Sequence, residues 1–377
     1  MKFLFVCGGS AGHINPALAI AEELRRKRPE SGILFVGADK TLEKRLIPDA
    51  GFDLVNIRMS GLRRGLSPGD IVHNIKTAGN LFAASSKSTK LMKEYKPDAV
   101  IGTGGYICYP VLKKAAKTGI PTFVLEPNAY PGLAVRMLSD VVDKVLVTYE
   151  GTKAGYRRPE RVVYTGTPLR NEFFKTENST CIPDRMDKPL VISYWGSLGA
   201  AGMNNMITEF IKLNYGEQKF NHIHATGAGT TTEDMKVRLK DLGVSEIKPP
   251  IVDIREYIDD MPSVMRSAEI VLSRAGASTI AELTTLGKPA VLVPSPNVTE
   301  NHQEENAKQL ENAGGAVMIR ESDCTGEILY RTIVSLLGDK DRLDSMASAQ
   351  KSLSVPDAAA KTVDIVLEFC KNDNVRR

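Results

Sequence analysis

The chain has 377 residues, of which 42% are hydrophobic, 25% charged and 6% aromatic. These proportions are ordinary for a soluble globular protein and exclude a disordered, collagen-like or coiled-coil chain. The length favours two domains, and the sequence has no run of about 18 uncharged apolar residues that would span a bilayer. The five cysteines are scattered without a Cys-x-x-Cys pair, which indicates a reducing cytoplasm, no disulfide framework and no zinc site.

The net charge of +4 conceals an asymmetry along the chain. Residues 1–165 contain 25 Lys and Arg against 15 Asp and Glu, so they carry +10 and the remainder carries −6. A basic first half indicates either an anionic partner or an ordinary solvated basic surface.

The first half of the chain alternates strand and helix patterns. Residues 2–7 form an apolar run that ends in glycines, which favours a first strand over an export signal. Asn15 is predicted as a helix N-cap, with Pro16 at the first helical position. Further elements are predicted as strands at 33–37, 99–101, 122–125 and 144–147 and a helix near 111–117.

A second series of strands and helices begins after the polar, proline-containing stretch 175–188, which indicates a boundary loop. Its predicted strands are 190–194, 222–226, 270–273 and 290–294, and its predicted helices are 203–213, 278–286 and 302–313. The two series predict an α/β fold of two Rossmann-like, doubly wound parallel-sheet domains that face a cleft. Ligands are expected beyond the carboxyl ends of the strands.

Three glycine-rich turns follow predicted strands. The first, residues 8–13, allows close backbone approach to an anion or a sugar but lacks the GxGxxG spacing of a dinucleotide site. His13 at its end is interpreted as a general base or as a structural hydrogen-bonding residue. Residues 102–106 form a close-approach loop or a plain tight turn, and residues 195–200 are a candidate loop for phosphate or base binding.

Two further segments carry candidate binding residues. Residues 273–283 read as a strand, a turn of small residues and a helix whose open N–H groups would suit a diphosphate. Glu282 in that helix would accept hydrogen bonds from two ribose hydroxyls, or it would cap the first turn. The polar run 301–307 would bind sugar hydroxyls or would be a solvated helix start.

Taken in order, these motifs resemble the MurG family of glycosyltransferases over nearly the whole chain. The matching segments are GGSAGHINPALAIAEEL (8–24), FVG (35–37), IGTGGYICYPV (101–111), EPNAYPGL (126–133), GTPLR (166–170), GSLGA (196–200), YIDDM (257–261), SRAGASTIAEL (273–283) and NHQEENA (301–307). Several positions depart from the usual family motifs: Ser10, Leu125, Pro127, Thr167, Trp195 and Leu198.

The resemblance implies a GT-B architecture. Residues 1–165 would form the acceptor and membrane-facing domain, with 355–377 packing back on it, and 166–354 would bind the UDP-sugar. The implied reaction is an inverting transfer of N-acetylglucosamine from UDP-GlcNAc to the C4 hydroxyl of muramic acid in undecaprenyl-pyrophosphoryl-muramyl-pentapeptide (lipid I). This peptidoglycan precursor step would take place at the cytoplasmic face of the cell membrane, on a peripheral protein.

The resemblance also assigns candidate site residues. His13 would be the catalytic base, and Gly104, Gly105 and Tyr106 would lie on the acceptor side. The donor would contact Ser10, Ala11, Gly12, Asn128, Arg170, Ser197, Ile258, Ala277, Ser278, Thr279, Ile280, Ala281, Glu282 and Gln303. No metal, cofactor or nucleic acid is expected.

A basic and partly apolar region of the first half is predicted to dock on the anionic inner leaflet of the membrane. It comprises residues 59–66, Leu81, Phe82 and the lysines at 87, 90, 93 and 96; the alternative is a buried loop followed by a solvated helix.

Rival functions are another nucleotide-sugar enzyme of the same fold (a diacylglycerol glycosyltransferase or a UDP-GlcNAc 2-epimerase) and a non-catalytic scaffold that binds lipid-linked sugar. An NAD-dependent oxidoreductase is a more distant rival, supported by Asp39 alone.

Overall fold

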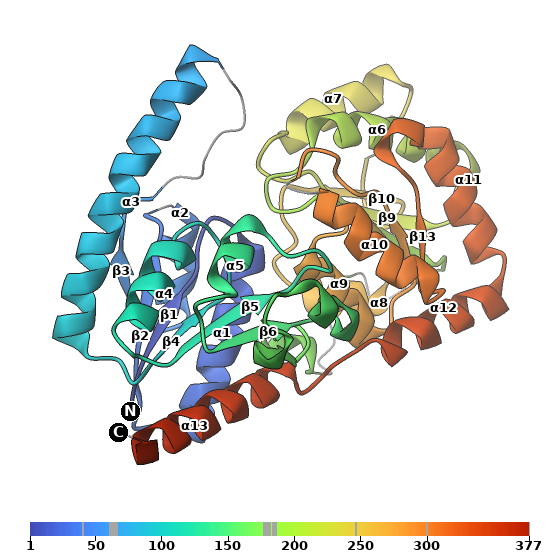
Figure 1. Cartoon of the computed structure of the whole chain (residues 1–377). Coiled ribbons are helices and arrows are strands. Elements are labelled where there is room, and N and C mark those ends of the chain that lie inside the picture. Colours follow the sequence, from blue (N-terminus) through green and yellow to red (C-terminus); the bar gives the residue numbers. More distant parts are fainter. Residues whose placement is uncertain are drawn as a thin grey trace. The chain divides into compact units, whose positions relative to one another are not determined.

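The computed structural model describes residues 1–39, 41–59, 67–175, 182, 187–245, 247–298 and 301–376 (Figure 1). The chain divides into two compact units, Met1–Arg170 with Val355–Arg377, and Asn171–Ser354. The division therefore falls after Arg170, slightly beyond the predicted boundary at 165. Most of the predicted boundary loop at 175–188 lies outside the described residues.

The first unit contains a seven-stranded parallel sheet in the order β3-β2-β1-β4-β5-β6-β7. Its strands are β1 (Lys2–Val6), β2 (Gly32–Gly37), β3 (Asp53–Asn56), β4 (Ala99–Gly102), β5 (Thr122–Glu126), β6 (Lys144–Val147) and β7 (Val162–Tyr164). Its helices are α1 (Ala11–Lys27), α2 (Thr41–Asp49), α3 (Pro68–Tyr95), α4 (Cys108–Lys117), α5 (Leu133–Leu138) and α13 (Ala358–Arg376), with short 3-10 turns at Glu150–Gly155 and Pro159–Arg161.

The second unit contains a six-stranded parallel sheet in the order β10-β9-β8-β11-β12-β13. Its strands are β8 (Leu190–Tyr194), β9 (Asn221–Ala225), β10 (Val252–Arg255), β11 (Ile270–Ser273), β12 (Ala290–Leu292) and β13 (Ala316–Met318). Its helices are α6 (Ala201–Glu217), α7 (Thr232–Asp241), α8 (Met261–Ser267), α9 (Ala277–Leu286), α10 (His302–Asn312), α11 (Gly326–Leu337) and α12 (Lys340–Ser352), with 3-10 turns at Asn171–Phe173 and Glu321–Asp323.

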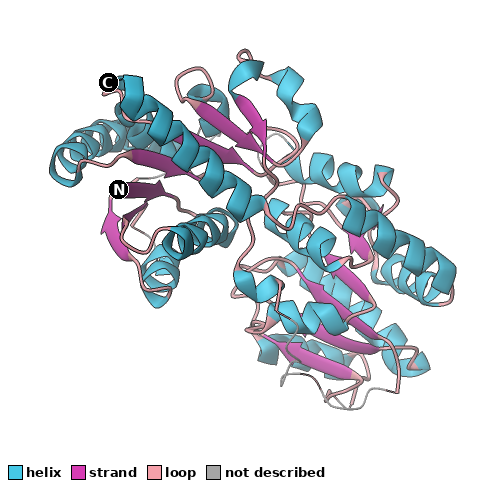
Figure 2. Ribbon diagram, turned by 90° about the horizontal axis from the view of Figure 1, so that it is seen from below, coloured by secondary structure: helices cyan, strands magenta, loops and turns pink. Residues whose placement is uncertain are grey.

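Each sheet is covered by helices on both faces (Figure 2), as its sequence pattern requires. In β1, Phe3 and Phe5 pack in one buried cluster with α1, while Leu4 and Val6 pack in another with α4. All four side chains are fully buried. The prediction of two doubly wound parallel α/β domains is therefore confirmed.

The C-terminal helix α13 belongs to the first unit and runs beside α1 (Figure 1). Val363, Val366 and Leu367 join the same buried cluster as Phe3 and Phe5. Phe369 meets Phe123 edge-on at 5.5 Å between ring centroids, and Lys27 on α1 pairs with Asp364 at 2.6 Å. One face of the first sheet is thus completed by residues from the far end of the chain.

The predicted start of α1 is wrong. The helix begins at Ala11 rather than after Asn15, because Ser10 adopts the extended N-cap conformation and its carbonyl accepts the Ile14 N–H at 3.2 Å. Pro16 lies inside the helix, where it cannot donate a backbone hydrogen bond. The sequence pattern also predicts none of the short strands β3, β7, β10 and β13, nor helices α2, α5, α7, α8, α11 and α12, and it offers a helix in the region of α3 only as an alternative.

A chain of hydrogen bonds between histidines lies in the core of the second unit. His222 and His224, two residues apart on β9, are both fully buried and point to the same face. Ser193 Oγ lies 2.8 Å from His222 Nε2 and 2.7 Å from His224 Nδ1, and His224 Nε2 lies 3.2 Å from Asn204 Oδ1. Because Asn204 Oδ1 can only accept, His224 carries its hydrogen on Nε2, and Ser193 donates to its Nδ1. His222 Nε2–H then donates to Ser193.

Both imidazoles are neutral in the folded protein. Burial lowers the pKa of His222 well below its ordinary value, and it lowers the pKa of His224 to about 3. Unfolding exposes both rings to water, where they bind protons below about pH 6.5. Above pH 6.5 the two neutral imidazoles therefore do not lower the free energy of unfolding. Below pH 6.5 the unfolded state is favoured increasingly, because only it binds the protons.

We predict that the free energy of unfolding falls by about 1.4 kcal/mol per histidine for each pH unit below 6.5. Urea denaturation of the full chain at pH 7, 6 and 5 measures this slope. The double variant His222→Gln/His224→Gln should flatten the slope, whereas His73→Gln in the first unit should leave it unchanged. An equal slope in the double variant and the parent would contradict the assignment.

Candidate functional site

The strand order of each sheet reverses at one point, between β1 and β4 in the first unit and between β8 and β11 in the second. At such a point, neighbouring strands send their connections in opposite directions and leave a crevice at their carboxyl ends. The predicted glycine loops lie at these ends: residues 8–10 and 103–106 in the first unit, and 195–200 and 274–276 in the second. The two loops within each unit are therefore neighbours.

In the first unit, the two glycine loops pack closely around the ring of His13 and the turn that carries it. A Cβ added at Gly104, where φ is +120°, would lie 2.3 Å from His13 Cδ2. A Cβ added at Gly105, where φ is +89°, would lie 2.3 Å from the carbonyl oxygen of Gly8. Both positions need glycine for their backbone conformation and for the close approach, so the second loop forms the seat of the first loop's histidine.

Hydrogen bonds fix the orientation of His13. Its Nδ1 lies 3.0 Å from the carbonyl oxygen of Gly8 and 3.3 Å from Ser10 Oγ. Because a carbonyl oxygen only accepts, Nδ1 carries the hydrogen of the neutral ring and Nε2 carries the lone pair. The Thr103 hydroxyl donates to the backbone carbonyl of His13 at 2.6 Å. His13 is thus arranged to accept a proton at Nε2.

The buried carboxyl of Glu126 organises the loop that carries Asn128. It accepts hydrogen bonds from the Asn128 backbone N–H at 3.0 Å, the Asn128 side-chain amide at 2.9 Å and the Gly132 N–H at 2.7 Å. Burial raises the pKa of Glu126, and these donors act against that rise. Sequence reasoning assigned no role to Glu126 or Thr103, although each is a polar residue at the buried end of an apolar strand.

Apart from Ser10, the remaining candidates of the first unit are not among the His13 ring contacts described above. Ser10, Ala11 and Gly12 form the start of α1. Tyr106 is 49% exposed directly after Gly105. Arg170 belongs to the first unit, contrary to its expected place in the UDP-sugar domain, and its Nε lies 3.8 Å from Glu22 Oε1 on α1.

In the second unit, the loop after β8 packs against the loop after β9. A Cβ added at Gly199, where φ is +70°, would lie 2.1 Å from the carbonyl oxygen of Thr226. The carbonyls of Ser197 and Leu198 accept the N–H groups of Ala228 and Gly229 at 3.2 and 2.9 Å. The Ser197 side chain is exposed at this turn.

The start of α9 has the features of an anion-binding site. Gly276 is its N-cap and has no side chain to cap the first N–H groups, and the first turn contains no acidic residue. The Asn306 amide donates to the carbonyl of Ala275 at 3.1 Å and so ties α10 to this turn. Ala277, Ser278 and Thr279 form the first turn and are partly exposed, so backbone N–H groups there can meet an anion.

Glu282 lies in the second turn of α9, so it is not a first-turn cap and that interpretation is wrong. Burial raises the pKa of Glu282 to about 8. Burial also raises the pKa of the Tyr194 hydroxyl, with the Glu282 carboxyl as the next cause. The side chains of Ile280 and Ala281, between the first turn and Glu282, are buried in the core and can offer a ligand only their backbone.

The last two candidates support neighbouring loops. Ile258 is buried just after β10. Gln303 Oε1 accepts the Ser295 N–H at 2.9 Å, across the loop that follows β12. The Gln303 amide nitrogen carries the hydrogens that a sugar hydroxyl could accept.

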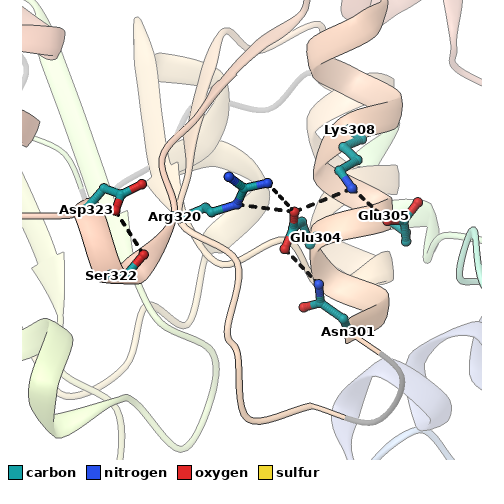
Figure 3. Close-up of polar contacts among 7 residues, drawn as sticks. All are labelled: Asn301, Glu304, Glu305, Lys308, Arg320, Ser322 and Asp323. Atoms are coloured by element: carbon teal, nitrogen blue, oxygen red, sulfur yellow. Dashed lines mark hydrogen bonds and ion pairs between the residues drawn. The ribbon is translucent and has the colours of Figure 1, made fainter.

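The polar run at 301–307 forms an ion-pair network of its own (Figure 3). Glu304 Oε1 accepts from Arg320 Nη2 at 2.9 Å, Glu304 Oε2 accepts from the Asn301 amide at 2.7 Å, and Lys308 lies 3.4 Å from Glu304. These partners lower the pKa of Glu304 to about 2. Glu304 therefore stabilises the start of α10, which leaves Gln303 as the run's candidate binding residue. Within the described ranges, no group of three His, Cys, Asp or Glu side chains is placed to hold a metal ion.

Comparisons with known proteins show the family to which the chain belongs. The family model of the glycosyltransferase family 28 N-terminal domain matches residues 3–147, and that of the C-terminal domain matches residues 192–362. A protein of Acetivibrio thermocellus is 40% identical over 99% of both chains, and one of Listeria monocytogenes serovar 1/2a is 37% identical over 98% of this chain and 100% of its own. Both are named UDP-N-acetylglucosamine--N-acetylmuramyl-(pentapeptide) pyrophosphoryl-undecaprenol N-acetylglucosamine transferase. The chain belongs to the MurG family.

Solved structures agree with membership of the MurG family. MurG of Acinetobacter baumannii superposes with a TM-score of 0.73 at 26% identity, covering 97% of this chain and 99% of its own. UDP-GlcNAc 2-epimerase from Neisseria meningitidis, bound to UDP-GlcNAc, has a TM-score of 0.69 at 16% identity and covers 98% and 100%. The epimerase shares the GT-B fold alone, whereas the MurG relatives are similar in sequence over nearly the whole length of the chain.

Proposed function

We propose that this chain transfers N-acetylglucosamine from UDP-GlcNAc to the C4 hydroxyl of muramic acid in lipid I, which yields lipid II. The observation that carries the proposal is the seating of His13, with its Nδ1–H bonded to Gly8 and its Nε2 able to accept a proton. The near full-length relatives named for this reaction support it. Because lipid II is a precursor of peptidoglycan, loss of the activity would impair cell-wall synthesis, cell shape and division.

The proposed reaction is one inverting displacement without a covalent intermediate. His13 Nε2 takes the proton of the acceptor hydroxyl as its oxygen bonds to the anomeric carbon. The bond from that carbon to the UDP oxygen breaks at the same time, and UDP leaves with the electron pair. The N–H groups at the start of α9 stabilise the diphosphate charge that develops.

The other candidates fit this reaction as binding residues. Glu282 would accept hydrogen bonds from the ribose hydroxyls, and Gln303 would bind a sugar hydroxyl. Tyr106 would line the acceptor side, while Gly104 and Gly105 act by seating His13. The remaining proposed donor contacts are Ser10, Ala11, Gly12, Asn128, Arg170, Ser197, Ile258, Ala277, Ser278, Thr279, Ile280 and Ala281.

A transfer assay with labelled UDP-GlcNAc tests the function and the base together. We expect product with lipid I but none with diacylglycerol, and no change of UDP-GlcNAc without acceptor, which an epimerase would cause. His13→Ala should lower kcat by roughly 10²–10⁴-fold, while the Kd for UDP-GlcNAc changes less than about twofold, because the ring acts on the acceptor proton. Wild-type turnover in His13→Ala, with chemistry rate-limiting, would remove His13 from the mechanism.

The raised pKa of Glu282 predicts a pH-dependent affinity for the donor. A ribose bound through two hydroxyl donors favours the ionised carboxylate, so binding should release a proton below about pH 8. We expect the affinity for UDP-GlcNAc to rise up to tenfold per unit as the pH rises from 6 towards 8, and then to level off. Isothermal titration calorimetry measures both the affinity and the proton release.

The matched variant for this prediction is Glu282→Gln, which keeps the shape of the side chain but cannot ionise. Its affinity should be lower at pH 8 and nearly independent of pH. The 2′-deoxyribose form of the donor should lose affinity for the parent but little for the variant. If the affinity lost through Glu282→Gln and the affinity lost through removal of the 2′-hydroxyl simply add in the combined measurement, the ribose contact lies elsewhere.

We further propose that the protein docks on the anionic cytoplasmic leaflet as a peripheral protein. Among the described helices, none is long and apolar enough to cross a membrane. On α3, Phe82 is 85% exposed, and Lys87, Lys90 and Lys93 are exposed further along the helix. The predicted segment 60–66 lies outside the described residues. An exposed ring and exposed lysines further along the same helix suit shallow insertion with contacts to anionic headgroups.

Vesicle sedimentation tests the docking. At about 1 kcal/mol per basic residue near the surface, Lys87→Glu/Lys90→Glu/Lys93→Glu should weaken binding to phosphatidylglycerol vesicles about 100-fold or more, and added salt should weaken binding of the parent. The control reverses three exposed lysines of the second unit: Lys212, Lys240 and Lys340. Equal partitioning of the α3 variant and the parent would place the docking surface elsewhere.

A further inference from the structure

A buried carboxylate lies beneath the first glycine loop. Glu43, in the first turn of α2, is fully buried. A Cβ added at Gly8 would lie 2.6 Å from Glu43 Oε1, and one added at Gly37 would lie 3.2 Å from the Glu43 side chain. Two glycines thus leave the space that this carboxylate occupies.

Glu43 and His13 bond to opposite ends of one peptide group. Glu43 Oε1 accepts the Gly9 N–H at 2.8 Å. The carbonyl of the same peptide, that of Gly8, accepts the Nδ1–H of His13 at 3.0 Å. Hydrogen bonds in series polarise one another, so negative charge on Glu43 increases the negative charge on the Gly8 oxygen.

The charge of Glu43 is not neutralised by an ion pair within the part of the chain that the structure describes. Its second oxygen, Oε2, is buried and has no hydrogen-bond partner there. Burial raises the pKa of the Cys7 thiol in the loop floor, with Cys108 and then Glu43 as smaller causes. A buried unpaired carboxylate is costly, and the molecule retains it directly under the histidine loop.

We propose that Glu43 is a positioning residue for His13: through the Gly8–Gly9 peptide it holds the hydrogen on Nδ1 and stabilises the protonated imidazole that forms during transfer. The arrangement resembles the carboxylate–histidine pair of hydrolases, with one peptide group between the two partners. The inference rests on the proposed role of His13 as the base.

The other titratable groups near this series stay in one charge state. Cys7 on the β1 side and Cys108 on α4 are buried thiols; burial raises the pKa of both, that of Cys108 to about 12. Asp39, ahead of α2, pairs with Lys44 at 2.7 Å and with Arg58 at 4.0 Å on a more exposed surface.

The test is Glu43→Gln, which can still accept from the Gly9 N–H but carries no charge. By NMR titration without substrate, we expect the pKa of His13 to fall by about one unit. The acidic limb of the kcat–pH profile should move by the same amount, and kcat at pH 7 should fall about 3- to 10-fold with KM for UDP-GlcNAc unchanged. The five histidines of the chain allow His13 to be assigned from the spectrum of His13→Ala.

Two variants and one measurement on the parent complete the test. Glu43→Asp keeps the charge and should restore part of the shift, and Glu23→Gln removes another buried carboxylate and should leave His13 unchanged. In the unaltered protein, the ¹⁵N shifts of neutral His13 should show hydrogen on Nδ1, a result that needs no variant to fold.

Three results would overturn the proposal. These are an unmoved His13 titration in Glu43→Gln, a loss confined to KM or thermal stability, and hydrogen on Nε2 in the parent. An active His13→Ala enzyme would instead refute the proposed base while leaving the titration result intact, so the two failures are distinguishable.

Discussion

The reversal of strand order in each parallel sheet is the constraint on which the functional arrangement depends. Because β1 and β4 are neighbours whose connections run in opposite directions, residues 8 and 104–105 meet although nearly a hundred positions separate them. The contact is so close that neither Gly104 nor Gly105 tolerates a Cβ. The same reversal at β8 and β11 places the exposed turn at Ser197 beside the open start of α9.

The sequence predicts the central strands and the glycine loops because buried parallel strands are continuous apolar runs and because turns after them require glycine. Short strands such as β3 and β13 are missed, since three or four residues with polar neighbours carry no clear period. The start of α1 is misplaced because Asn15 and Pro16 match the local preferences of a helix N-terminus, whereas Ser10 takes the N-cap position in the folded chain. Local preference was overruled there by the geometry of the β1 turn.

The candidate site is predicted only in part, because the sequence shows local motifs but not the contacts between distant residues. His13 and the α9 turn lie within recognisable motifs, and family resemblance supplies their roles. The residues that hold His13 received no role from the sequence, although Thr103 lies in a matching segment: Thr103 bonds to a residue ninety positions away, and Glu43 lies thirty-four positions from its partner Gly9. Such contacts depend on which strands are neighbours, and a single sequence shows that only through the fold.

The position of α13 has a consequence for the order in which the chain acquires its structure. Val363, Val366 and Leu367 belong to the core of the first unit, yet a ribosome makes them after every residue of the second unit. The second unit, Asn171–Ser354, can therefore bury its core while the first still lacks the α13 side chains that complete one face of its sheet. Biosynthesis of this protein thus finishes the first-made unit last, and a nascent chain remains open at the α1 surface until the helix that covers it has emerged.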